Sequence, residues 1–181
     1  MAEIKSSIQI AMERAAALGQ ADSGEQDREE GKRQGRALGR RAASGELAPE
    51  NLASSLAGLP QEQRDSARQA AALALLEDME EGWQGRLTAL AALAAGGPAE
   101  AAVVELARVL AQEERLTVDL HAELAGELLA GLAAEGISGS AVHPNPAVQP
   151  QLKERYDQAV AACEPRRLAA LAGVSQAFQT S

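Results

Sequence analysis

Apolar residues recur every three or four positions along most of the chain, which is the spacing of one face of an α-helix. The first such stretch predicts an amphipathic helix within residues 1–20 that stops at Gly19. Its apolar face consists of Ile4, Ile8, Ala11, Ala15 and Leu18. The chain therefore opens with a helix that has one face to bury.

Residues 21–46 form a polar arm that is nearly bare of large apolar groups. Its acidic residues come first and its basic residues second, an order that suits the polarity of a helix, and Ser23 with Gln26 fits a capping box. Each of Gly31, Gly35 and Gly39 weakens a helix by about 1 kcal/mol relative to alanine. The arm is therefore predicted to be a marginal, solvated helix or a flexible segment.

Residues 47–135 carry the strongest helical pattern. Pro49–Ala57 reads as a short helix closed by Gly58 and Pro60. Two longer helices, 61–95 and 98–135, flank a Gly-Gly-Pro connection, and so short a link predicts a long antiparallel hairpin. The expected buried stripes are Leu73, Leu76, Met79, Trp83, Leu87, Leu90 and Ala94 in the first helix, and Val103, Leu106, Leu110, Leu120, Leu124, Leu128 and Leu132 in the second.

Three polar residues, Glu113, Glu114 and Thr117, interrupt the second stripe where leucine is expected. The interruption favours a place where the helix leaves the core or breaks. The alternative is that polar residues in the seam fix the register of the two helices. The spacing alone does not separate these interpretations.

Residues 136–150 form an uncharged Gly/Pro connector, "GISGSAVHPNPAVQP", ahead of a C-terminal helix over 151–181. Its prolines disfavour the helical region for the residues before them and stiffen the segment. Ile137 and Val142 are expected to lie along the hairpin or to contact a partner. Pro165 falls inside the last apolar pattern and is expected to kink or split that helix.

The apolar fraction, 46%, is ordinary, but it is mostly alanine and leucine, and the only aromatic residues are Trp83, Tyr156 and Phe178. Alanine favours helices yet buries little surface, so each buried contact gains less than a leucine or phenylalanine contact. We expect many helices around a thin core, completed by self-association or by a protein partner. Part of the alanine excess also fits a genome rich in G and C.

Candidate chemistry is sparse. His121 and His143 lack the helical spacing of a zinc or di-iron motif, and the single cysteine, Cys163, lies on an apolar helix face. Asp119, Glu123 and Glu127 share one helix face and read as a solvated acidic surface. A reactive role for Cys163, or an enzyme site gathering His143, Cys163 and the connector, is the weaker alternative. We therefore expect no catalytic residues, no metal and no cofactor.

The net charge of −9 argues against a nucleic-acid-binding surface that spans the whole domain. One basic patch remains, in residues 32–41, where Lys32, Arg36 and Arg40 share a face. It has no interleaved aromatic residues for base stacking. Neither a secretory leader nor a stretch long enough to span a membrane is evident, so a cytoplasmic location is expected.

The segments "MAEIKSSIQIAMER" and "GISGSAVHPN" resemble the two ends of a small bacterial family of helical proteins. The members of that family begin with a similar amphipathic helix and carry a Gly-Ser-Ala-Val-x-Pro-Asn segment after a long helix. The family has no assigned activity, so the resemblance implies a helical architecture and a common role for the late segment.

Together these patterns predict an all-α protein: an N-terminal amphipathic helix, a long antiparallel helical hairpin and a kinked C-terminal helix. The function we expect is a non-enzymatic scaffold, adaptor or assembly factor that binds protein partners or itself, in the manner of a coiled coil. The alternative is a regulatory nucleic-acid-binding protein. The candidate partner contacts are Ile137, Ser138, Val142, His143, Lys32, Arg36 and Arg40.

Overall fold

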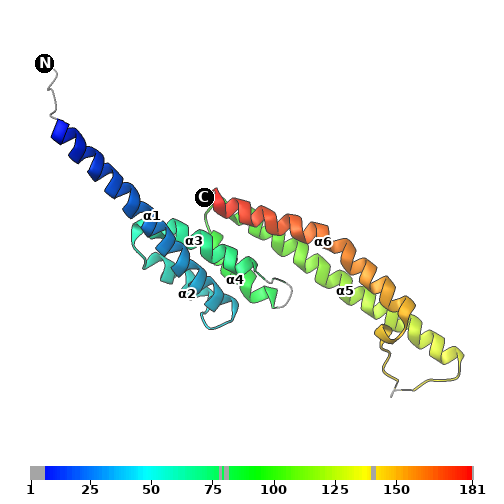
Figure 1. Cartoon of the computed structure of the whole chain (residues 1–181). Helices are drawn as coiled ribbons and strands as arrows, with labels where there is room; N and C mark the ends of the chain where they lie inside the picture. The colour runs from blue at the N-terminus through cyan, green and yellow to red at the C-terminus, as the bar shows by residue number, and fades with distance from the viewer. Residues whose placement is uncertain (1–6, 78, 80–81, 140–141, 181) are drawn as a thin grey trace. The chain divides into compact units, whose positions relative to one another are not determined.

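The computed structural model of the chain describes residues 7–77, 79, 82–139 and 142–180, with side chains from residue 24 onward. These residues form helices and connections between them, without a strand, which confirms the all-α class (Figure 1). The helices are α1 (Ser7–Ala43), α2 (Pro49–Ala57), α3 (Gln61–Leu76), α4 (Trp83–Ala94), α5 (Glu100–Ala134), the 3₁₀ turn η1 (Pro146–Val148) and α6 (Pro150–Gln179). The chain divides into two compact units, Met1–Val103 with Ser175–Ser181, and Val104–Val174.

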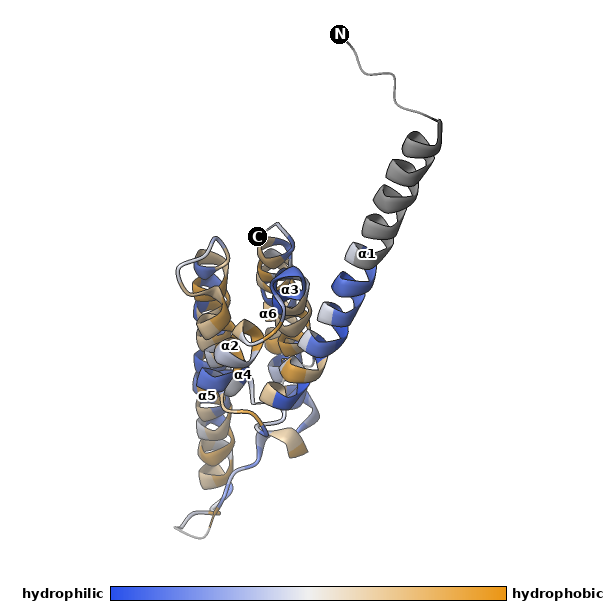
Figure 2. Ribbon diagram, turned by 90° about the vertical axis from the view of Figure 1, so that its left-hand side faces the viewer, coloured by the Kyte–Doolittle hydropathy of each residue, from blue (hydrophilic) through white to orange (hydrophobic). Residues whose placement is uncertain are grey.

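Helix α1 joins two segments that the sequence pattern separates. It continues through Gly19, where a stop is expected, and through the polar stretch that reads as an arm, up to Ala43. The predicted stop at Gly19 is therefore wrong. The residues in the middle of this helix are hydrophilic, as the blue colouring in Figure 2 shows. For this reason the sequence pattern gives no sign that the helix has a buried face.

The three glycines of α1 form that buried face. Gly31, Gly35 and Gly39 are all buried, and they lie directly against the backbone of α3. A Cβ atom built on Gly35 would lie 2.0 Å from the carbonyl oxygen of Ala67. Spaced four residues apart, glycines lie along one side of a helix and let two backbones approach more closely than side chains permit. These glycines lower the helix propensity of α1, but they also allow its close contact with α3.

Helix α3 contributes mostly small residues to this contact with α1. Its buried positions are Gln63, Ala67, Ala70, Ala71, Ala72, Ala74 and Leu75. Leu73, which the sequence places in the core, is 37% exposed. The expected leucine stripe is wrong here, because small residues face the glycines of α1 and the buried leucine of α3 is Leu75 instead. Gln63, the one polar residue of this set, donates from its Nε2 to Oδ1 of Asp27, 3.1 Å away.

The first arm of the predicted hairpin, 61–95, consists of two helices. Helix α3 ends at Leu76, Glu77 has an extended backbone, and Gly82 takes a left-handed conformation (φ 64°) before α4 begins. Helix α2 has the predicted bounds, with Pro49 at its start and Gly58 as its C-cap. Leu52 and Leu56 of α2 are buried, as are Leu90 and Leu93 of α4. Together with Leu75 of α3 and Phe178 near the end of α6, they supply the larger buried side chains of the first unit.

In the second unit α5 runs antiparallel to α6. Leu124 and Leu128 form a buried cluster with Leu152 of α6, and Leu120, Leu132 and Tyr156 pack against it. The antiparallel hairpin of 61–95 with 98–135 is therefore not confirmed: α3 packs on α1, and α5 packs on α6. Pro165 lies inside α6 without ending the helix, so the helix is not split there, and the kink stays a prediction.

Glu113 lies in the seam between α5 and α6 and is paired across it. Its Oε1 accepts a hydrogen bond from Nη1 of Arg167, 3.0 Å away, and the two side chains are only 13% and 20% exposed. The helix does not break at the polar interruption, since α5 continues through it to Ala134. No residue of α5 between Leu110 and Leu124 is fully buried, so the apolar core is interrupted along this stretch and the Glu113–Arg167 pair joins the two helices there. That the polar residues fix the register of the two helices stays a prediction.

The connector begins with a Schellman turn. Gly136 has φ 82°, its amide donates to the carbonyl of Ala133, and the amide of Ile137 donates to that of Leu132, which together satisfy carbonyls at the end of α5. Further along, Oδ1 of Asn145 accepts a hydrogen bond from the amide of Ala147 and starts η1. Residues 140 and 141 lie outside the described residues.

The glycine contact predicts opposite effects for the same substitution at two places on α1. In Gly35→Ala the new methyl group meets the backbone of Ala67, and such overpacking costs about 1–3 kcal/mol. Gly24→Ala is the matched control, because nothing lies within 4 Å of its Cβ position, and it should stabilise the helix by up to ~1 kcal/mol. The measurement is the free energy of unfolding in urea. Equal stability of the two variants would contradict the contact.

The polar pair predicts a non-additive result. Arg167→Leu leaves the largely buried Glu113 carboxylate without this cation, and we expect faster amide hydrogen exchange in α5 and α6, corresponding to a loss of about 1–3 kcal/mol. Replacing both residues by leucine removes the stranded charge and should restore most of that protection. A double variant less protected than Arg167→Leu would count against the pair as described.

Candidate functional site

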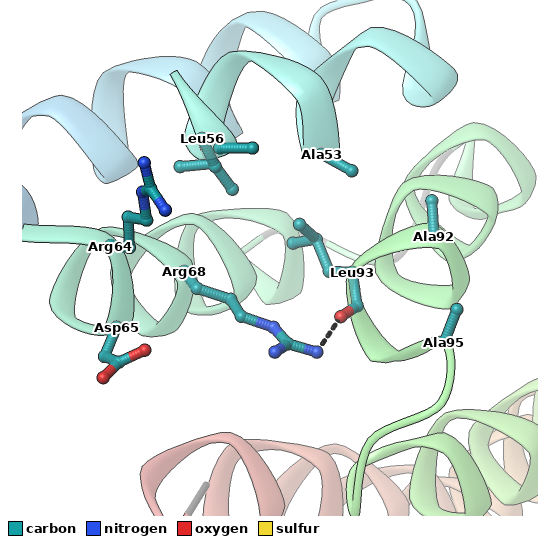
Figure 3. Close-up of a pocket in the computed structure, with 9 residues that line it drawn as sticks. Ala53, Leu56, Arg64, Asp65, Arg68, Ala92, Leu93 and Ala95 are labelled. Carbon is teal, nitrogen blue, oxygen red and sulfur yellow. Dashed lines mark hydrogen bonds between the residues drawn. The ribbon is translucent and has the colours of Figure 1, made fainter. Parts of the chain in front are cut away.

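The first unit contains a hollow of about 350 Å³ between α2, α3 and the end of α4 (Figure 3). Its walls are mostly aliphatic, and three polar residues of α3 lie among them. The lining residues are Ala53, Leu56, Ala57, Arg64, Asp65, Arg68, Ala92, Leu93 and Ala95. This volume falls at the lower end of the range for small-molecule sites, about 300–1,000 Å³.

Alanine is the reason that the hollow exists. Ala53 and Ala57 are one turn apart on α2, Ala92 lies in the last turn of α4, and Ala95 is the C-cap of that helix. A methyl group at these positions does not reach the neighbouring helix, whereas Leu56 and Leu93, both buried, hold the helices in place. The space left between them is lined by apolar surface.

Arg64 and Arg68 are four residues apart on α3 and therefore lie on the same side of that helix. Nε of Arg64 donates to the carbonyl of Leu59 at 2.8 Å. Nη2 of Arg68 donates to the carbonyl of Leu93 in the last turn of α4, where a cation also interacts favourably with the helix dipole. Each guanidinium is thus oriented by a backbone carbonyl.

Neither arginine is neutralised by a carboxylate within the described residues. Asp65 also lines the hollow, but Figure 3 shows its side chain directed away from both guanidinium groups. Most other basic side chains of the described chain do form ion pairs, among them Lys32, Arg33, Arg40, Arg41, Arg108, Lys153, Arg155 and Arg167. The hollow therefore combines apolar walls with positive charge.

The basic patch of α1 is exposed but largely paired. Nζ of Lys32 lies 2.6 Å from Glu29, and Arg40 lies 3.5 Å from Glu77 of the loop after α3. Hydrogen bonds from Gln34 and Arg33 hold the pKa of Glu30 below its ordinary value, so this acid stays charged beside the patch. Arg36 is exposed and shares with these cations a surface hollow of about 330 Å³.

The candidate residues of the connector lie in the other unit. Ile137 is 49% exposed, Ser138 and His143 are exposed, and Val142 is half-buried. The basic patch of α1 belongs to the first unit, and the candidate residues of the connector belong to the second. The structure therefore does not show them as parts of one site.

The residues considered for chemistry are also dispersed. Cys163 is half-buried within α6, where its Sγ donates to the carbonyl of Ala159, and about 20 Å of helix separates it from Pro150 at the start of α6. His143 lies before that helix, in the connector. His121 is exposed, and Glu127 pairs with Arg155 at 2.6 Å. Across the part of the chain that is described, no three metal-ligating side chains cluster, and no helix there is long and apolar enough to cross a membrane.

Sequence reasoning did not find the hollow. Its only trace in the sequence is the pair Arg64 and Arg68, combined with alanines spaced four apart in 53–57. Neither feature indicates a site until the three helices are packed together.

Comparison with models of protein families, with curated proteins and with solved structures finds no match to this chain.

The two arginines of the hollow are predicted to differ in their effect on folding. Arg68→Gln removes the hydrogen bond to the end of α4 and should lower the free energy of unfolding by about 1–2 kcal/mol. Arg64→Gln, on an exposed side chain, should change it by less than about 0.5 kcal/mol. Urea denaturation measures both. A larger loss for Arg64→Gln would show that the roles of the two arginines are reversed.

Proposed function

We propose that the protein is a non-enzymatic scaffold, adaptor or assembly factor that binds protein partners or itself through one side of the α5–α6 pair. The observation that supports this most is a row of exposed apolar side chains outside the seam. Val104 is 63% exposed, Val118 61%, Leu129 40% and, on α6, Leu168 55%.

These residues lie on the same side of the pair. Val104, Val118 and Leu129 each follow a seam residue of α5 by one position, and Leu168 likewise follows Arg167 on α6. In an antiparallel pair, positions that follow the seam by one on both helices lie on the same side. Alanines at 111, 122 and 125 continue the row on α5, and Figure 2 shows hydrophobic colouring along much of this helix.

The other side of the pair is ionic, which supports the same geometry. Glu123 and Glu127 each precede a seam leucine by one position, Arg155 precedes Tyr156 by one, and Arg155 pairs with both acids. A hydrogen bond from Arg155 also keeps the pKa of Glu127 below its ordinary value. One side is thus suited to solvent, whereas the other exposes apolar surface of the kind that protein contacts bury.

The nucleic-acid alternative has less support. Lys32 and Arg40 are paired with acids, and Glu30 remains charged beside them. Nucleic-acid binding depends on cations that neutralise phosphates, and cations already paired within the protein contribute less to it. We therefore place the protein-binding function first.

The proposal predicts that a charge on the apolar side disrupts association. Leu129→Arg should abolish self-association, or the capture of a protein partner from the native cell extract, because the interface would then bury an unpaired charge. The measurements are sedimentation velocity of the full chain and quantitative co-purification.

Leu116→Arg is the matched control. Leu116 is 43% exposed, close to Leu129, but it precedes the seam residue Thr117 and therefore lies on the ionic side. It should leave association unchanged. Equal loss in both variants, or a monomeric wild-type chain that captures nothing, would contradict the proposal.

A further inference from the structure

We propose that the hollow between α2, α3 and α4 binds a carboxylate carried on a small aliphatic body. The site lies wholly in the first unit and does not depend on the association proposed for α5 and α6.

The walls determine the body of the ligand. Six of the nine lining residues are alanine or leucine, and the chain contributes no aromatic ring to the hollow. An aliphatic group that enters it exchanges water for apolar surface, which favours binding by roughly 25 cal/mol for each Å² buried. A small branched or linear alkyl group matches both the lining and the volume.

The arginines determine the head group. A guanidinium carries five N–H donors in a planar fork that matches a carboxylate. Only one donor of Arg64 and one of Arg68 have a partner in the described structure, Leu59 and Leu93 respectively. The guanidinium of Arg64 lies beside Leu56 in Figure 3, and its remaining donors have no hydrogen-bond partner among the described residues.

The charge balance favours a single negative charge. Arg64 and Arg68 bring two positive charges, and Asp65 brings one negative charge to the same lining. A carboxylate therefore leaves the site neutral, whereas a phosphate monoester, close to a dianion at neutral pH, leaves it negative. The net charge of −9 also repels anions elsewhere on the surface, so anion binding here is not a general property of the protein.

The test uses the full chain labelled with ¹⁵N and titrated with 4-methylpentanoate, followed by amide and arginine Nε–H resonances. We expect saturable shifts confined to residues that line the hollow, with a Kd on the order of 1–10 mM for so small a ligand. The neutral isostere 4-methylpentanamide should bind at least about tenfold more weakly, because it lacks the charge.

Two variants locate the site, and one serves as control. Arg64→Gln should weaken binding about tenfold or more while leaving the fold intact. Ala57→Leu should abolish binding, because the new leucine side chain fills the hollow from α2 while both arginines stay in place. Arg28→Gln removes an exposed charge of α1 and should bind like the wild type.

An aliphatic carboxylate can come from a small acid or from the C-terminus of a protein. The peptide Ala-Ala-Leu, with a free or an amidated C-terminus, distinguishes these two sources. Tighter binding of the free peptide than of 4-methylpentanoate assigns the hollow to a protein C-terminus, and the reverse order assigns it to a small acid. Equal binding of acid and amide, unchanged binding by Arg64→Gln, or the absence of saturable shifts overturns the proposal.

Discussion

The first unit depends on the approach of two backbones, because Leu38 is the one large apolar side chain in the part of α1 whose side chains are described, residues 24–43. Gly31, Gly35 and Gly39 remove every side-chain atom from one line along α1, and α3 presents its own backbone and alanine methyl groups to that line. The contact gains from many short-range dispersion contacts instead of large buried groups. Shape, more than hydrophobic volume, therefore determines which helix α1 selects.

The same small residues have a second effect where helices meet at a wider separation. Between α2, α3 and α4 the alanines do not fill the space, and a hollow remains beside two arginines. A core built from leucine and phenylalanine would close this gap. The alanine-rich composition thus produces a close contact on one face of α3 and an open hollow on another, and which of the two results depends on the distance between backbones.

The helical class, α2 and the seam of α5 could be predicted from periodicity, because their apolar residues are large and regularly spaced. The continuity of α1 could not, since glycine counts against a helix in every local scale and its benefit appears only when α3 is present. The helices that pack against α3 and α5 could not be predicted either, because other pairings of helices satisfy the same leucine spacing. The Glu113–Arg167 pair joins positions far apart in sequence, so it was recognisable only as an interruption. The hollow needs three packed helices before it exists.

The glycine line has a consequence for how this protein changes over evolutionary time. A contact that uses backbone shape places strict demands on the three glycine positions of α1 and on the small residues opposite them, and few demands on the residues between. The exposed positions of α1 are then free to change, whereas α3 is also constrained on its other side, where Arg64 and Arg68 line the hollow. Kinship among such chains would survive as a regular spacing of small residues on two facing helices.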